Sequence, residues 1–185
     1  MALPKSVKAK LEGMKKQGIY LVVAKAADYE DVNYAVVEYL VNKMKMNGVY
    51  VTLNKPFSTM KNIFKERKIP IDKVMFLDGI SKTIIGETTP DKNVQYVESP
   101  ESLTDLSIAV NLMASQISPP RFLFFDSLST LLVYNASGPV TKFAHFLIGR
   151  MRKWEINGVI VSIEEETDSK LYGEISQFCD GVIKV

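Results

Sequence analysis

The feature that most constrains the fold is a regular alternation of short apolar runs with longer segments whose apolar residues recur every three or four positions. The apolar runs predict strands at residues 18–23, 49–53, 74–77, 94–97, 121–126, 159–163 and 181–185. The periodic segments predict helices at residues 57–68, 102–115, 139–154 and 169–178, and a further helix from Tyr29 to a stop at Asn47-Gly48. Strands that alternate with helices form right-handed crossovers and a sheet covered on both faces. We therefore expect a three-layer α/β fold with a mainly parallel, doubly wound sheet.

Two local features refine this expectation. The polar stretch 81–93 contains Gly86 and Pro90 and is predicted to be a surface loop. The period of the helix at 139–154 predicts that these residues face the core: Phe143, Phe146, Leu147, Ile148 and Met151.

The chain has 185 residues and 46% hydrophobic content, which suffices for one core and predicts one domain. We expect an N-terminal basic helix at residues 1–17 and an α/β core at 18–185. The basic residues of the first segment are Lys5, Lys8, Lys10, Lys15 and Lys16. They predict a solvated helix face, with docking of nucleic acid or of an acidic partner as the alternative. The net charge of +2 is too small to imply nucleic acid by itself.

Targeting signals and disulfides are not expected. No stretch reaches the roughly 20 apolar residues of a membrane helix, and the first residues lack the apolar core of a signal peptide. We expect a soluble, cytoplasmic protein without a membrane partner. Cys179 and His145 are the single cysteine and the single histidine, which excludes an internal disulfide and a zinc cluster of the Cys/His type. We expect Cys179 to be a small buried residue and His145 to have a surface or packing role.

Ligands of such sheets bind beyond the carboxyl ends of the strands, so the residues that follow each apolar run are the candidates for a site. A phosphate-binding loop after the first strand needs glycines, whose backbone N–H groups close around the phosphate. Segment 24–31 contains no glycine, and the spacing of Gly13 and Gly18 precedes the strand instead of following it. Asp28, Glu30 and Asp31 place three carboxylates where a phosphate would bind, and we expect them to repel it.

Several segments carry a resemblance to a known family. The run RFLFFDSLSTLLVYN at 121–135 resembles the Walker B strand of KaiC-type domains, and GVYVTLNKP at 48–56 resembles their second strand. FLDGIS at 76–81 is similar to an acidic turn of archaeal relatives, while 158–166 and 175–185 resemble the closing strands. As a pattern, almost the whole chain is similar to a KaiC/RecA-like P-loop ATPase domain of archaeal type, degenerate in that it lacks the Walker A motif.

The resemblance implies a strand order and one functional position. Asp126 matches the family position that holds the water shell of Mg²⁺, and is therefore the candidate metal ligand. The family order would place the strand at 159–163 beside the first strand, with the strand of Asp126 one further out. Asp126 and Glu164 would then share a cleft.

Two interpretations of the acidic residues stay open. In the first, Lys25, Asp126, Ser127 and Glu164 form a vestigial nucleotide site with a divalent cation at Asp126. In the second, Asp126 and Asp78 hydrogen-bond the turns after their strands, and Glu164 to Glu166 form a solvated loop.

The leading functional hypothesis is a non-catalytic KaiC/RecA-like domain that acts through protein contacts, in signal transduction or as a pseudo-ATPase subunit. It predicts no cofactor, and either a protein partner or a homo-oligomer. One alternative is a weak nucleotide-binding protein or residual ATPase that uses ATP and Mg²⁺ at Asp126. Another is a nucleic-acid-binding accessory protein. Arg150, Arg152 and Lys153, with Trp154, are a further candidate partner surface at the end of their helix.

Overall fold

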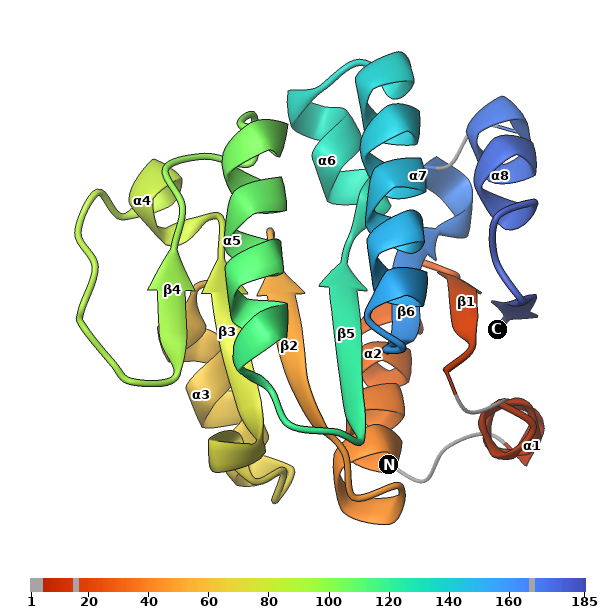
Figure 1. Ribbon diagram of the computed structural model, residues 1–185, viewed down its shortest axis with the longest axis horizontal. Helices are drawn as coiled ribbons and strands as arrows, with labels where there is room; N and C mark the ends of the chain where they lie inside the picture. Colours follow the sequence, from red (N-terminus) through yellow and green to blue (C-terminus); the bar gives the residue numbers. More distant parts are fainter. Residues whose placement is uncertain (1–4, 15–16, 167–168) are drawn as a thin grey trace.

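A seven-stranded parallel sheet forms the centre of the protein, in the order β4-β3-β2-β5-β6-β1-β7 (Figure 1). The computed structural model describes residues 5–14, 17–166 and 169–185. The strands are β1 (Ile19–Ala24), β2 (Asn47–Thr52), β3 (Val74–Asp78), β4 (Val94–Tyr96), β5 (Arg121–Asp126), β6 (Asn157–Ile163) and β7 (Gly181–Lys184). Each predicted strand therefore corresponds to an observed one, and the predicted three-layer parallel fold is confirmed.

Helices cover both faces of the sheet. One face carries α5 (Leu103–Gln116), α6 (Leu128–Tyr134), α7 (Ser137–Lys153) and α8 (Ser169–Ser176). The other face carries α1 (Lys5–Glu12), α2 (Tyr29–Glu38), which continues as a π-helical segment (Tyr39–Lys43), and α3 (Phe57–Glu66). Figure 1 shows α5 and α7 in front of the sheet, with α2 and α3 behind it. The remaining elements are α4 (Ser81–Ile84) and two short 3-10 helices at Ile71–Lys73 and Glu164–Glu166.

Each central strand contributes side chains to two cores. In β2, Val49 and Val51 face the layer of α5 to α8, whereas Tyr50 faces α2 and α3. The same alternation in β5 sends Phe124 toward α2, and two residues later Asp126 points to that side as well. Because these strands are buried on both faces, their sequences are apolar throughout instead of alternating.

The strand order implied by the resemblance is confirmed. Strand β6 lies between β1 and β5, so the strand that ends at Ile163 neighbours β1 and that of Asp126 is one further out. The loop after β1, where a ligand would bind, therefore lies beside the carboxyl end of β6. The carboxyl end of β5 lies one strand further away.

Two local predictions are wrong. The stretch 81–93 is not loop throughout, because the Asp78 carboxylate accepts hydrogen bonds from the backbone of Ile80 and Ser81 and so starts the short helix α4. Phe146 does not face the core but is 43% exposed. The arc of α7 that contacts the sheet is filled by other residues of the predicted stripe, and the Phe146 ring lies outside that arc beneath the Arg150 guanidinium.

The N-terminal basic segment is a helix from Lys5 to Glu12, and Lys15 and Lys16 lie outside the described residues. Over the ranges that the structure describes, no helix has the length and apolar character required to span a membrane.

Gly48 and Gly149 lie in opposite packing environments, so we expect opposite effects when each is changed to alanine. A Cβ added at Gly48 of β2 would lie 2.3 Å from the ring of Phe122, which is fully buried on the neighbouring strand. We expect Gly48→Ala to lower the free energy of unfolding by about 2–3 kcal/mol, because the ring has nowhere to move. A Cβ at Gly149 of α7 meets nothing within 4 Å. Gly149→Ala should raise the free energy by about 0.5–1 kcal/mol, since alanine favours a helix interior. Urea unfolding measures the free energy of unfolding of both variants. Equal changes in Gly48→Ala and Gly149→Ala would contradict the prediction.

Candidate functional site

Asp126 ends β5 in a closed polar cluster. It is 3% exposed, and its carboxyl oxygens accept hydrogen bonds from three side chains. Tyr29 Oη and Asn33 Nδ2 donate to Oδ1, the latter over 3.2 Å, and Tyr50 Oη donates to Oδ2 over 2.5 Å. We call Asp126, Tyr29, Asn33 and Tyr50 the Asp126 cluster. Both oxygens of the carboxyl group are thus engaged by groups of the protein itself.

The cluster follows from elementary geometry. Tyr29 and Asn33 are four residues apart on α2 and so lie on one face of that helix. Thr52 pairs with Asp126 in the sheet, and Tyr50, two residues earlier, presents its side chain to the same face. Stacking of the Tyr50 ring on Phe124, with 4.9 Å between ring centroids, fixes where its hydroxyl points.

Burial dominates the ionisation of this cluster. Removal from water raises the pKa of Asp126 to about 8 and also raises the pKa of Tyr50 well above its usual value. At neutral pH the Asp126 carboxyl group is therefore mostly neutral. Asn33 Oδ1 is buried and accepts no hydrogen bond in the described part of the chain, so turning the amide over would give the Asp126 proton an acceptor.

The turn after β1 is closed by hydrogen bonds within the chain. The N–H of Lys25 donates to Val185 O over 3.2 Å, and that of Asp28 donates to Lys25 O over 3.0 Å. The N–H of Ala26 donates to a carboxylate oxygen of Glu165 over 3.1 Å. The carboxylate of Glu165, in the segment that follows β6, therefore already binds to this turn.

Ion pairs neutralise part of the negative charge that the sequence places near the start of α2. Glu30 pairs with Lys55 over 2.6 Å, and Asp31 pairs with Arg67. Two of the three carboxylates near the start of α2 are therefore neutralised by cations, and their repulsion of a phosphate is weaker than expected. Asp28 alone remains without an ion pair in the described residues, so the closed turn matters more than the charge.

The four residues of the candidate vestigial nucleotide site lie in different surroundings. Lys25 and Glu164 are exposed and follow β1 and β6, which pair in register at Ala24 and Ile163. Ser127 is buried and accepts a hydrogen bond from Thr130 N, which caps α6 on the other face of the sheet. Among the described residues no hydrogen bond or ion pair joins any two of the four. Nor does any group of three His, Cys, Asp or Glu side chains suited to a metal occur in those ranges.

The two strand-end aspartates differ in their roles. Asp78 does hydrogen-bond the turn that follows its strand, as expected, through Ile80 N and Ser81 N. The same expectation for Asp126 is wrong, because its carboxyl group turns away from Ser127 and toward α2 and β2. The sequence patterns do not identify Tyr29, Asn33 and Tyr50 as partners of Asp126. The available signal was Tyr50, a residue whose hydroxyl needs a partner in the middle of a strand buried on both faces.

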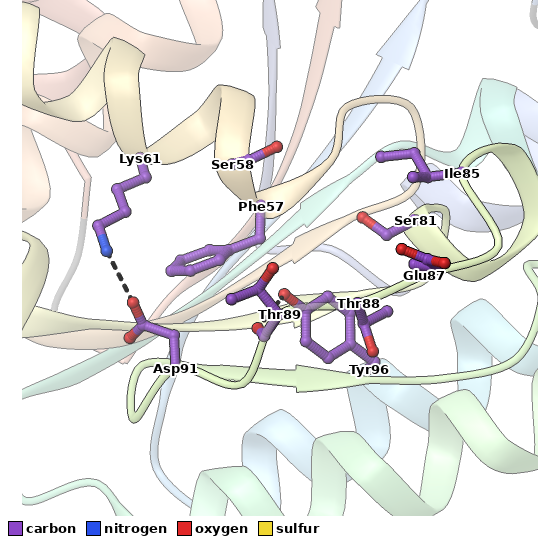
Figure 2. A pocket seen from close by; sticks show the side chains of 10 residues that line it. All are labelled: Phe57, Ser58, Lys61, Ser81, Ile85, Glu87, Thr88, Thr89, Asp91 and Tyr96. Atoms are coloured by element: carbon purple, nitrogen blue, oxygen red, sulfur yellow. Dashed lines mark hydrogen bonds and ion pairs between the residues drawn. The ribbon is translucent and has the colours of Figure 1, made fainter.

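A pocket, separate from the Asp126 cluster, lies at the β4 edge of the sheet and is shown in Figure 2. It has a volume of about 460 Å³ and is lined by Phe57, Ser58, Lys61, Ser81, Ile85, Glu87, Thr88, Thr89, Asp91 and Tyr96. The rings of Phe57 and Tyr96 form part of its wall, and Lys61 pairs with Asp91 over 2.7 Å across one side. Its volume suits a small ligand. Several of its polar groups already have partners, since Ser81 Oγ donates to Asp78 and Tyr96 Oη donates to Thr89 O.

The other residues of interest are not placed for chemistry. His145 is exposed on α7 and stacks on Phe178, with 4.1 Å between ring centroids, which confirms a packing role. Cys179 is half-buried against the core of α5 to α8, and burial raises its pKa to about 11.

Cys179 should therefore be a slow nucleophile. Because only the thiolate reacts, we expect its rate with a disulfide reagent at pH 8 to be roughly 100-fold below that of free cysteine. Absorbance of the released thiol measures the rate, and unfolding in urea should restore the ordinary value. A native rate equal to the unfolded rate would show that the thiol is not protected.

Comparison with known proteins agrees with this fold. The model of DUF7504, described as a family of unknown function, matches residues 79–185, which is more than half of the chain. A search of curated proteins finds no match. The crystal structure of a KaiC-like protein from the hyperthermophilic archaeon Pyrococcus horikoshii is similar, with a TM-score of 0.62 and 13% sequence identity. The similarity covers 93% of this chain and 72% of that one, and at this identity it shows a shared fold only.

Proposed function

Because the chain belongs to DUF7504, a family of unknown function, and has the fold of a KaiC-like protein, we propose that it is a non-catalytic KaiC/RecA-like domain. Its role is to contact other proteins in the cytoplasm, in signal transduction or as a pseudo-ATPase subunit. The phosphate-binding loop of the fold is degenerate in this chain, and the nucleotide position is occupied by the protein's own side chains.

The Asp126 cluster is the single observation that carries this proposal. A carboxylate that helps to hold Mg²⁺ must be charged and must reach the ion or its water shell. Asp126 is buried, mostly neutral at pH 7 and engaged on both oxygens by Tyr29, Asn33 and Tyr50. Nucleotide binding of the usual kind would require α2 to move away from β5.

The turn after β1 supports the same conclusion. A phosphate binds to a turn through free backbone N–H groups and a nearby cation. Here the N–H of Ala26 already donates to Glu165, and that of Lys25 donates to Val185 O. The residues present therefore do not fit ATP and Mg²⁺, and we derive no catalytic step through them.

A thermal-shift screen tests the proposal. A ligand at 100 times its dissociation constant stabilises the native state by about 2.7 kcal/mol, which would move the melting temperature by several degrees. With millimolar ATP, ADP or GTP and Mg²⁺, we expect no shift above about 1 °C on this scale, for wild type and for Asp126→Ala alike. A shift that requires Mg²⁺ and disappears in Asp126→Ala would support the alternative of a residual ATPase.

A further inference from the structure

We infer that the exposed face of α7 is a docking site for an acidic segment of another protein. The inference rests on the proposed function, because it names the kind of partner through which a non-catalytic domain would act. It is carried by the charge, the shape and the side-chain contacts of one surface, which we call the α7 surface: Lys142, His145, Phe146, Gly149, Arg150 and Lys153.

The charge of α7 is one-sided. The helix has 17 residues, of which four are Lys or Arg and none is Asp or Glu. Arg152 is neutralised by Asp180 over 3.1 Å, but Lys142, Arg150 and Lys153 have no carboxylate partner among the described residues. Cations in the last turn suit the helix dipole, which accounts for Arg150 and Lys153. Lys142 lies in the N-terminal half of the helix, where the dipole gives no reason for a cation.

The α7 surface is also hollowed. The six residues line a shallow depression of about 530 Å³, and none of them is acidic. Gly149 leaves its middle without a side chain, and a Cβ built there would meet nothing within 4 Å. Glycine in a helix interior costs about 0.5–1 kcal/mol relative to alanine, and here no packing against the rest of the protein requires it. A glycine at this point lets the backbone of a partner approach the helix closely.

Side-chain contacts hold the surface in shape. The Arg150 guanidinium lies 5.0 Å from the centroid of the Phe146 ring, which is itself 43% exposed. His145 is held by stacking on Phe178. The Arg150 side chain is thus ordered before a partner arrives, and less conformational entropy is lost when it pairs with a carboxylate. Phe146 beside it offers contact to an apolar side chain of the same partner.

An acidic protein segment fits this surface better than nucleic acid. From Lys142 to Lys153 the helix rises about 16 Å and presents three unpaired cations, whereas nucleic-acid interfaces commonly neutralise about six to ten phosphates. The Arg150 guanidinium already lies over the Phe146 ring, so the part of the ring that stays exposed suits contact with an apolar side chain better than stacking of a base. The exposed Glu155 just after the helix repels anions of either kind, so the cationic surface ends at Lys153 and suits a short acidic segment better than a long phosphate backbone. A protein segment with two or three carboxylates around one apolar residue matches the three cations and the exposed part of Phe146.

The test uses a fluorescein-labelled 16-residue peptide of glutamate and leucine at helical spacing, with a lysine and leucine peptide and a 16-nucleotide single strand of DNA as comparisons. Fluorescence anisotropy is read on the full chain without nucleotide. We expect the acidic peptide to bind in the micromolar range and to weaken at least 10-fold when salt rises from 50 to 300 mM. The lysine peptide should not bind, and the DNA should bind at least 10-fold more weakly.

Matched variants locate the binding. Gly149→Glu and the double change Lys142→Glu with Lys153→Glu should each weaken binding of the acidic peptide at least 10-fold, whereas Gly149→Ala, which adds only a methyl group at the point of close approach, should weaken it less than Gly149→Glu does. Lys65→Glu reverses one cation, as each half of the double change does, at an exposed position of α3 on the other face of the sheet, and should have less than a twofold effect. Melting curves of all variants are recorded to test whether each is folded, and we expect Gly149→Glu to fold because a side chain at this position meets open space.

Four outcomes would overturn the inference. They are no binding of the acidic peptide, equal loss in Lys65→Glu, DNA binding that exceeds peptide binding and depends on Lys142 and Lys153, and self-association that the double change abolishes. The last would make a second copy of the chain the occupant, and sedimentation velocity would detect it. None of these outcomes involves Asp126 or nucleotide, so failure here is distinguishable from failure of the proposed function.

Discussion

Asp126→Asn is expected to stabilise the protein progressively as the pH rises from about 4 to about 8, while changing little at pH 4. Asparagine resembles the neutral carboxyl group in shape: its amide oxygen can accept a hydrogen bond from one of the two tyrosines, Tyr29 or Tyr50, and its amide nitrogen can donate to the hydroxyl oxygen of the other. It carries no charge that burial penalises. Wild type and variant should therefore differ in the pH dependence of stability more than in stability at any single acidic pH.

The sign follows from proton linkage. Burial raises the pKa of Asp126 from 3.8 to about 8, so between these values the native state keeps a proton that the unfolded state has lost. Stability from this group is present below pH 4 and is lost as the pH rises toward 8. The largest slope that one group can give is about 1.4 kcal/mol per pH unit. We expect the difference between Asp126→Asn and wild type to grow toward that slope across the window.

Urea unfolding from pH 4.5 to pH 8.5 measures the effect. Asp72→Asn makes the same chemical change at an exposed position and should stay close to wild type throughout. A difference between Asp126→Asn and wild type that stays constant from pH 5 to pH 8 would show that Asp126 ionises in the native state like an ordinary carboxylate.

Asp78→Asn is expected to destabilise the protein strongly, by about 3 kcal/mol or more, because a buried acceptor would be replaced by a donor. The Asp78 carboxylate is fully buried and accepts four hydrogen bonds, from the backbone N–H groups of Phe57, Ile80 and Ser81 and from Ser81 Oγ. An amide nitrogen in this place would face N–H groups that donate and would leave at least one of them unpaired. One carboxyl oxygen serves the start of α3 and the other the start of α4, so one of these two helix starts would lose its acceptor.

Ser81→Ala separates the contribution of the Ser81 hydroxyl from that of the Asp78 carboxylate. That change removes one hydroxyl donor but leaves the three backbone donors and the carboxylate in place, and we expect it to cost about 1 kcal/mol. Circular dichroism during urea unfolding measures both variants. Equal costs for Asp78→Asn and Ser81→Ala would contradict the view that the carboxylate organises both turns.

The fold was largely predictable because it depends on local patterns. The apolar runs identified every strand, and the resemblance of residues 121–135 and 158–166 to a known family implied that β6 lies between β1 and β5. Phe146 was assigned wrongly, since a 3.6-residue period defines an arc of a helix but not how wide the contacting arc is. The start of α4 was missed because it depends on Asp78, whose hydrogen bonds the composition of the loop does not reveal.

The candidate site was predictable only in part. The absence of glycine from residues 24–31 is visible in the sequence, and so is Asp126 at the end of an apolar run. The partners of Asp126 lie 76 to 97 residues away along the chain, and only the register of β2 with β5 brings Tyr50 to it. Likewise the pairing of Glu165 with Ala26 requires the fold, although both residues follow predicted strands.

Calorimetric titration of the protein with ATP in the presence of Mg²⁺ tests the central claim most directly. If the Asp126 cluster and the closed turn after β1 replace a nucleotide, wild type should give no saturable heat up to millimolar ATP. Asp126→Ala, run as a matched control, should behave identically. Saturable binding that needs Mg²⁺ and is lost in Asp126→Ala would contradict the account, because it would mean that Asp126 leaves Tyr29 and Tyr50 to serve a bound metal ion.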